Sequence, residues 1–110
     1  MPSNNDKLGA TEISRGATAL SEIVIYQHTR WNEGQYGWEL RTNLTWFYIG
    51  DDKNDQASSC VVVSGTWRLY TETGCDENQG TYKDFGPGSY ERLEDYGIPN
   101  DSLSSFKPLP

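Results

Sequence analysis

Several residue types are scarce in this 110-residue chain, and each scarcity argues against a class of function. A single histidine, His28, leaves little from which to build a Ser-His-Asp or Cys-His catalytic arrangement. Cys60, Cys75 and His28 could in principle form a Cys₂His zinc site, but no short ligand spacing supports one. Nine Lys and Arg against sixteen Asp and Glu give a net charge of −7, whereas nucleic-acid binding requires basic side chains that neutralise phosphates. We therefore expect neither an enzyme nor a nucleic-acid-binding protein.

Long apolar stretches are also missing. Only 35% of the residues are hydrophobic, and no run approaches the roughly 20 residues that span a membrane. Residues 1–16 contain no apolar core of a signal peptide, so no signal peptide is visible. The length suits one domain. We predict that residues 1–21, rich in small and polar side chains, form a flexible segment and that residues 22–108 form the folded domain.

Aromatic residues and glycine are abundant by contrast. Four Trp, seven Tyr and three Phe can fill a small core, because each ring buries a large area. Eleven Gly and five Pro favour short strands joined by turns, and the only weak helical pattern covers about one turn at residues 89–97. The chain is therefore predicted to be all-β. Strands are predicted within residues 22–28, 36–42, 45–50, 60–65, 66–72, 80–90 and 104–108.

One polar hexapeptide occurs twice in the sequence. Asn-Asp-Gln-Ala-Ser-Ser covers residues 54–59, and Asn-Asp-Ser-Leu-Ser-Ser covers residues 100–105, 46 positions later. The pairs Ile25-Tyr26 and Leu69-Tyr70 lie 44 positions apart, so the repeat extends beyond the hexapeptides. This pattern predicts two four-stranded Greek keys, at about residues 22–64 and 65–108, whose sheets face each other in a β-sandwich.

The repeated motifs carry a resemblance to a known family. Paired Greek keys that open with Tyr-x-x-x-x-aromatic-x-Gly and close with Asn/Asp-Asn/Asp-x-x-Ser/Thr-Ser are typical of the βγ-crystallin superfamily. The closing motif is present twice without a mismatch. The opening motif is partial: Tyr26 and Trp31 are followed by a late Gly34, and after Tyr70 the aromatic position holds Cys75. Residues 22–108 resemble the single-domain microbial and archaeal crystallins.

The closing hexapeptides have the chemistry of a calcium site. Ca²⁺ takes six to eight oxygen ligands, and Asp55 and Asp101 offer carboxylates while Ser58 and Ser104 offer hydroxyls. The first hexapeptide and its flanks do not fit the pattern of an EF-hand loop. The alternative is that Asn-Asp forms a turn and Ser-Ser satisfies nearby backbone groups without any ion. Two copies in matching units favour calcium.

The resemblance also implies a geometry, in which two Ca²⁺ ions are held in double clamps shared by the two closing loops. It predicts a monomeric calcium-binding protein whose fold the ions stabilise. A secreted inhibitor or toxin-like protein on the same fold, recognisable by a protruding apolar hairpin around residues 31–38, is the first alternative. A packing protein with incidental calcium binding is the second. The implied ligands are the main chains of Gln27, Gln56, Thr71 and Ser102 and the side chains of Asp55, Asp101, Ser58 and Ser104, with Asn54 and Asn100 orienting or ligating.

The two cysteines are interpreted by comparing the two keys. Alignment of Ser-Ser-Cys-Val-Val with Ser-Ser-Phe-Lys-Pro places Cys60 inward, at the position of Phe106. In the family, the position of Cys75 holds a ring that folds back over the strands. A disulfide between Cys60 and Cys75 would close about 15 residues and add roughly 3 kcal/mol. The alternative is two buried thiols. We predict the disulfide, which favours an extracellular location over a cytoplasmic one.

Overall fold

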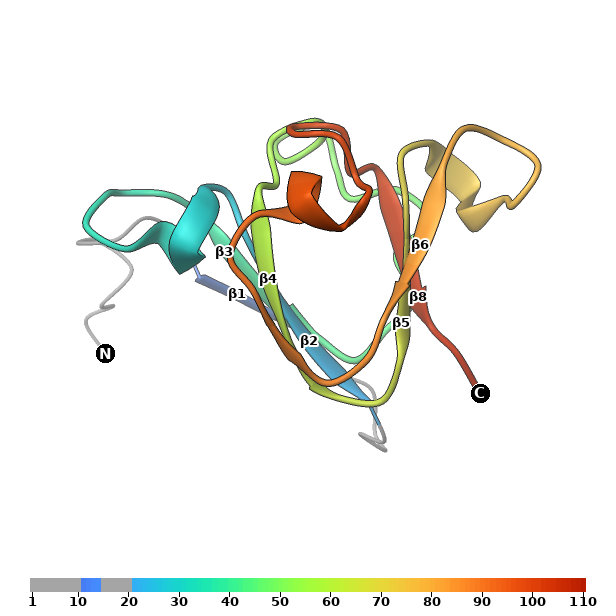
Figure 1. The fold of residues 1–110 in the computed structure, drawn as a ribbon, viewed down its shortest axis with the longest axis horizontal. Helices are drawn as coiled ribbons and strands as arrows, with labels where there is room; N and C mark the ends of the chain where they lie inside the picture. Colours follow the sequence, from blue (N-terminus) through green and yellow to red (C-terminus); the bar gives the residue numbers. More distant parts are fainter. Residues whose placement is uncertain (1–10, 15–20) are drawn as a thin grey trace.

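The computed structural model, which describes residues 11–14 and 21–110, consists of two facing sheets of short strands (Figure 1). The first sheet has the order β1-β3-β2-β4-β7, and the second has the order β6-β5-β8. Short 3₁₀ turns η1, η2 and η3 lie in the connections. The bounds are β1 Thr11–Ser14, β2 Glu22–Tyr26, η1 Thr29–Asn32, β3 Glu39–Thr42, β4 Ser59–Ser64, β5 Trp67–Tyr70, η2 Thr73–Cys75, β6 Tyr82–Phe85, β7 Gly88–Tyr90, η3 Leu93–Tyr96 and β8 Ser105–Pro108.

The two Greek keys exchange their third strands. β7 belongs to the second key but pairs with β4 of the first. The corresponding stretch of the first key, predicted as a strand at residues 45–50, is reduced to a bridge between Trp46 and Phe106 in the other sheet. After this bridge the chain bends toward the closing loop, where the Ile49 N–H donates to the Ser104 carbonyl oxygen at 2.8 Å. The predicted all-β double Greek-key sandwich is confirmed.

The predicted flexible segment at residues 1–21 falls largely outside the described residues. Its described strand, β1, pairs in parallel with β3, with Thr11 opposite Glu39 and Ser14 opposite Thr42. This pairing adds a strand to the edge of the first sheet, which the sequence pattern did not indicate. No helix in the part of the chain covered by the structure is long and apolar enough to cross a membrane.

The core lies between the sheets and continues to the end of the sandwich that the closing loops cover. In β5, Trp67 and Leu69 point into this core while Arg68 between them does not, as the two-residue period of a strand requires. The ring of Phe106 lies 6.2 Å from that of Trp46 and 5.9 Å from that of Trp67. The closing loops and the segments next to them add further apolar side chains to the core, so the candidate site lies directly above well-packed apolar residues. The buried apolar cluster comprises Ile23, Ile25, Leu40, Ile49, Ala57, Cys60, Val62, Trp67, Leu69, Phe85, Leu93, Ile98, Leu103 and Phe106.

The predicted disulfide between Cys60 and Cys75 is wrong, because both cysteines are free and buried. Cys60 points into the core from β4, as expected. Cys75 lies over the other sheet, where its N–H donates to Ser105 Oγ at 3.1 Å. Each hairpin folds back over its own key: Trp31, the counterpart of Cys75, donates from Nε1 to the Cys60 carbonyl oxygen at 3.2 Å. The extracellular assignment therefore loses the observation on which it rested.

Both thiols are expected to react slowly in the native protein. Burial raises the pKa of the Cys60 thiol far above its usual range and also raises that of Cys75, so little thiolate is present. Mass spectrometry after alkylation should find both cysteines modified in guanidinium without reductant and neither rapidly modified without denaturant. An intact mass two hydrogens lower before reduction would contradict the free-thiol assignment.

Candidate metal centre

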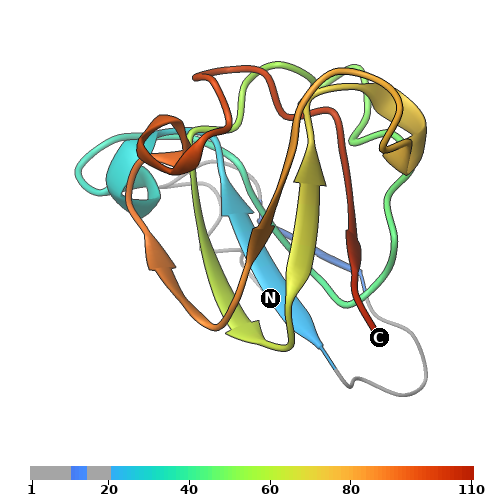
Figure 2. The same ribbon diagram turned by 45° about the vertical axis from the view of Figure 1, so that its right-hand side comes forward.

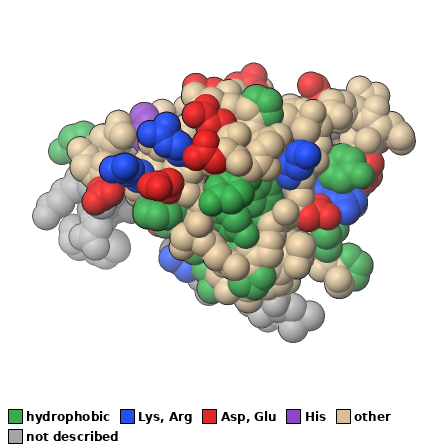
Figure 3. Space-filling model, viewed as in Figure 1, with side chains coloured by type: hydrophobic (Ala, Val, Ile, Leu, Met, Phe, Trp, Pro, Cys, Tyr) green, Lys and Arg blue, Asp and Glu red, His purple; other side chains and the backbone are tan. Residues whose placement is uncertain are grey.

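The two closing loops lie side by side at one end of the sandwich. Figures 1 and 2 show residues 50–58 and 97–104 running next to each other above the sheets. Acidic side chains also gather at this end of the space-filling view (Figure 3). Two segments separated by almost half of the chain are thereby brought into contact, as the repeated motif predicted.

Reciprocal hydrogen bonds join the loops. Ser58 Oγ lies 3.1 Å from Asn100 Oδ1 and 3.2 Å from Asp101 Oδ1. Ser104 Oγ donates to Asn54 Oδ1 at 2.6 Å. The fifth residue of each hexapeptide therefore contacts the first residue of the other, and Ser58 also reaches the second. Each loop supplies oxygen atoms to a cluster that the other loop completes.

The same backbone conformation recurs at the second residue of each motif. Asp55 has φ of 60° and Asp101 has φ of 59°, in the left-handed region that most L-residues avoid. Asp tolerates this region better than bulky or β-branched residues do, because its short polar side chain can bond locally. The Asp55 N–H also donates to the Leu103 carbonyl oxygen at 3.3 Å, which links the turn to the opposite loop.

Each closing loop is also tied to the opening hairpin of its own key. The Ser58 N–H donates to the Tyr26 carbonyl oxygen at 3.0 Å, and the Ser104 N–H donates to the Tyr70 carbonyl oxygen at 2.9 Å. Gln27 and Thr71, the predicted main-chain ligands, immediately follow these tyrosines. The matching bonds show that the pseudo-two-fold symmetry extends from the closing loops into the hairpins.

The last serine of each motif has a structural role that sequence reasoning missed. Ser59 Oγ donates to the His28 carbonyl oxygen at 2.5 Å, and Ser105 Oγ donates to that of Glu72 at 2.5 Å. Each of these hydroxyls also accepts a backbone hydrogen bond from the hairpin: Ser59 Oγ from the Trp31 N–H, and Ser105 Oγ from the Cys75 N–H. The repetition of Ser-Ser in both hexapeptides was the available signal, because the first serine alone accounts for the contact between loops.

A pocket of about 300 Å³ opens beside the loops on the side of the first key. Four predicted residues do not line it: Asn54, Thr71, Ser102 and Ser104. The Thr71 N–H donates to the Thr81 carbonyl oxygen at 3.0 Å, and Ser102 Oγ donates to the Pro99 carbonyl oxygen at 2.6 Å. The pocket is lined by six predicted residues, Gln27, Asp55, Gln56, Ser58, Asn100 and Asp101, and by His28, Thr29 and Gln35, which were not predicted.

Trp38 holds the side chains of the two pocket glutamines. Its backbone N–H donates to Gln27 Oε1 at 3.1 Å, and its indole Nε1 donates to Gln56 Oε1 at 3.1 Å. The side-chain oxygens of both glutamines are thus already engaged, which fits the expectation that these residues would ligate through their main-chain carbonyls. No sequence pattern indicated this role for Trp38.

A lysine next to the first hexapeptide is turned toward Asp52. Lys53 is buried, with its Nζ 2.9 Å from Asp52 Oδ2 and 5.9 Å from the centre of the Trp38 ring. The hydrogen bond from Lys53 lowers the pKa of the Asp52 carboxyl. Asp52 therefore remains ionised at neutral pH and partly balances the lysine charge near the cluster.

The donor set fits a hard cation. Carboxylates, hydroxyls, amide oxygens and main-chain carbonyls are the oxygen ligands that Ca²⁺ prefers. Within residues 11–14 and 21–110, no group of three or more His, Cys, Asp or Glu side chains is placed to hold a metal. Any ion between the loops would thus be bound mainly by neutral oxygens, with the carboxylates of Asp55 and Asp101 providing the formal charge.

Comparisons with known proteins agree with this architecture. A βγ-crystallin from an archaeon is 36% identical, with a TM-score of 0.68 and coverage of 81% of this chain and 98% of that one. A βγ-crystallin from Ciona intestinalis is 26% identical, with a TM-score of 0.68 and coverage of 80% and 99%. The βγ-crystallin domain of Abundant Perithecial Protein from Neurospora crassa, solved in its Ca²⁺-bound form, shares the fold at 17% identity, with a TM-score of 0.56 and coverage of 84% and 91%.

The sequence itself matches the family described as Beta/Gamma crystallin over residues 22–109. A search of curated proteins found no match. The family match covers most of the chain and includes both hexapeptides and both hairpins. The protein belongs to the βγ-crystallin family.

Proposed function

We propose that this protein binds two Ca²⁺ ions between its closing loops and that the ions stabilise its fold. The observation that carries the proposal is the reciprocal contact of Ser58 with Asn100 and Asp101 and of Ser104 with Asn54. The proposed first site comprises the main chains of Gln27 and Gln56 and the side chains of Ser58 and Asp101. The second comprises the main chains of Thr71 and Ser102 and the side chains of Ser104 and Asp55. Asn54 and Asn100 orient the serine hydroxyls.

The contacts between the loops support sharing of each ion. Without an ion, each serine hydroxyl donates a hydrogen bond to a side-chain oxygen atom of the opposite loop. A calcium ion supplies positive charge that brings several oxygen atoms together, so it would strengthen a junction that hydrogen bonds already form. The calcium-bound Neurospora relative supports the proposal through its fold. Since one chain supplies both halves of each clamp, we propose that the protein acts as a monomer.

Calcium is expected to raise the melting temperature of the chelator-treated protein by several degrees at millimolar concentration. With few formal charges per site, the dissociation constants should be on the order of 10⁻⁶–10⁻⁴ M. An ion that binds only the folded state adds about 2.7 kcal/mol per independent site when its free concentration is 100 times the dissociation constant. Calorimetric titration and thermal melting measure both quantities.

Magnesium at the same concentration is the matched control, because it prefers shorter bonds and strict octahedral geometry. We expect it to shift the melt by less than half as much. An unchanged melting temperature in calcium, together with no heat of binding, would contradict the proposed function.

The inhibitor-like alternative predicted a protruding apolar hairpin around residues 31–38. Trp31 instead donates its indole N–H to the Cys60 carbonyl oxygen in β4, and Trp38 donates its indole N–H to Gln56 Oε1 in the first closing loop. Tyr36, which is 68% exposed, is the large apolar side chain left at the tip. The hairpin therefore offers no apolar surface that specifically favours this alternative.

A further inference from the structure

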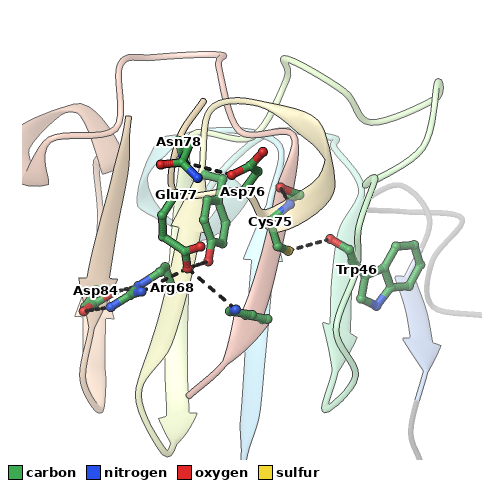
Figure 4. A network of polar contacts seen from close by, with 10 residues as sticks. Trp46, Arg68, Cys75, Asp76, Glu77, Asn78 and Asp84 are labelled. Atoms are coloured by element: carbon green, nitrogen blue, oxygen red, sulfur yellow. Dashed lines mark hydrogen bonds and ion pairs between the residues drawn. The ribbon is translucent and has the colours of Figure 1, made fainter. Parts of the chain in front are cut away.

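A network of charged side chains joins the second hairpin to the outer face of the second sheet (Figure 4). Glu77, in the hairpin, accepts a hydrogen bond from the Tyr70 hydroxyl at 2.5 Å and from Arg68 Nη1 at 3.0 Å. Lys107 Nζ lies 3.6 Å from the same carboxylate. Arg68 also forms a bidentate pair with Asp84, with distances of 2.6 and 2.9 Å. Glu77 thereby connects the hairpin to β5 and β8.

These partners hold Glu77 in its ionised form. The hydrogen bond from the buried Tyr70, the backbone N–H of Glu77 and the Arg68 guanidinium lower the pKa of the Glu77 carboxyl to about 2. The carboxylate is therefore charged throughout the pH range in which the protein would bind calcium. Charge-assisted hydrogen bonds of this kind are shorter and stronger than neutral ones.

The network leads directly to the proposed second calcium site through Tyr70. The hydroxyl of Tyr70 bonds to Glu77, while its carbonyl oxygen accepts the Ser104 N–H at 2.9 Å. Thr71, the next residue, pairs with Thr81 across the hairpin. The Thr71 N–H donates to the Thr81 carbonyl oxygen, and the Thr81 N–H donates to Thr71 Oγ1, both at 3.0 Å. Displacing Glu77 would therefore loosen the segment that carries both Thr71 and the anchor of Ser104.

The first key lacks this network. At positions equivalent to Arg68 and Lys107 it has Val24 and Val61, at offsets of 44 and 46 residues. Glu33 stands 44 residues before Glu77 but is exposed, and its carboxylate makes no ion pair within the described part of the chain. The two halves of the pseudo-symmetric centre are therefore supported by different means.

We propose that Glu77 is a positioning residue for the second calcium site, because its carboxylate fixes Tyr70 and the hairpin that presents the Thr71 carbonyl. The inference rests on the proposed function. It implies that the two sites are unequal and that the second is the more rigid before calcium arrives. Rigid presentation of a ligand raises affinity because less conformational freedom is lost on binding.

Residue-resolved NMR titration of the full chain with Ca²⁺ tests this role. In Glu77→Gln, amide shifts of Thr71 and Ser104 should report a dissociation constant about five- to tenfold weaker, near the low end for residues that orient metal ligands. Shifts of Gln27 and Gln56 should report a change of less than about twofold, as for weakly coupled sites. Glu33→Gln is the matched control, and it should change the dissociation constant of either site by less than about twofold.

The outcomes separate the two proposals. If the unmodified protein shows no calcium-dependent shifts, the proposed function fails and this inference fails with it. If the unmodified protein binds calcium but Glu77→Gln leaves both affinities unchanged, or weakens them equally, only the role of Glu77 is overturned.

A second measurement covers the case in which Glu77→Gln does not fold. In the calcium-free unmodified protein, the Thr71 amide should exchange with solvent more slowly than the Gln27 amide, although each donates one hairpin hydrogen bond of 3.0 Å. Equal or faster exchange at Thr71 would overturn the inference without any variant.

Discussion

Ser58→Arg should abolish one calcium site and weaken the other at least several-fold. Ser58 is only 7% exposed, and its hydroxyl lies within 3.2 Å of oxygens on Asn100 and Asp101. Arginine would remove a hydroxyl ligand and place a guanidinium among the oxygens that an ion requires, so the direct site should fail. The displaced loop should also misplace Asp55 and thereby weaken the second site.

Calorimetry with a two-site fit measures this result. Ser104→Arg should give the mirror image, because its bonds to Asn54 and to the Tyr70 carbonyl oxygen repeat those of Ser58 to Asn100 and Tyr26. Ser89→Arg is the control, since it adds the same charge at an exposed serine of β7, away from both closing loops. A Ser58→Arg protein that loses one binding event while the other keeps its normal dissociation constant would show that the sites are independent.

Phe106→Ala should have the largest effect on stability, lowering the free energy of unfolding by about 3–5 kcal/mol. The ring is fully buried and packs against Trp46 and Trp67. Alanine would leave a cavity between these rings that the rigid sheets cannot fully close. Since many domains have only about 5–15 kcal/mol of net stability, the variant should be close to unfolding without calcium.

Urea denaturation in the presence of a chelator measures the difference. Phe47→Ala is the matched control: Phe47 is 63% exposed, so its replacement should change the free energy of unfolding by less than about 0.5 kcal/mol. A loss of under about 1 kcal/mol at Phe106 would mean that the core does not depend on this ring.

The repeat made most of the fold predictable. Two identical motif patterns at offsets of 44 and 46 residues required two equivalent units, and an isolated four-stranded key would leave one apolar face exposed. The period also brought Ser58 and Ser104 to the same junction. The strand at residues 45–50 was overestimated, because its apolar side chains resemble a strand while its backbone pairs with β8 only at Trp46.

The supporting residues of the candidate site could not be predicted, because they act through contacts between segments far apart in the sequence. Trp38 supports Gln56 across 18 residues, and Ser59 holds the His28 carbonyl across 31. The disulfide was predicted by comparing equivalent positions of the two keys, but Cys60 points into the core from β4, whereas Cys75 lies in the second hairpin against Ser105. The second hairpin folds back over its own key, so Cys75 contacts Ser105 rather than Cys60.

The exchange of third strands between the keys also bears on synthesis of the chain. The first sheet needs β7, and the bridge at Trp46 needs Phe106, so neither sheet is complete until the second key exists. Domains usually fold as units as they emerge from the ribosome, beginning with N-terminal segments. Here the first key must wait, with one edge of β4 unpaired and the inner face of its sheet uncovered, until residue 108 has left the exit tunnel. The nascent chain is therefore expected to acquire protease resistance in a single late step rather than one key at a time.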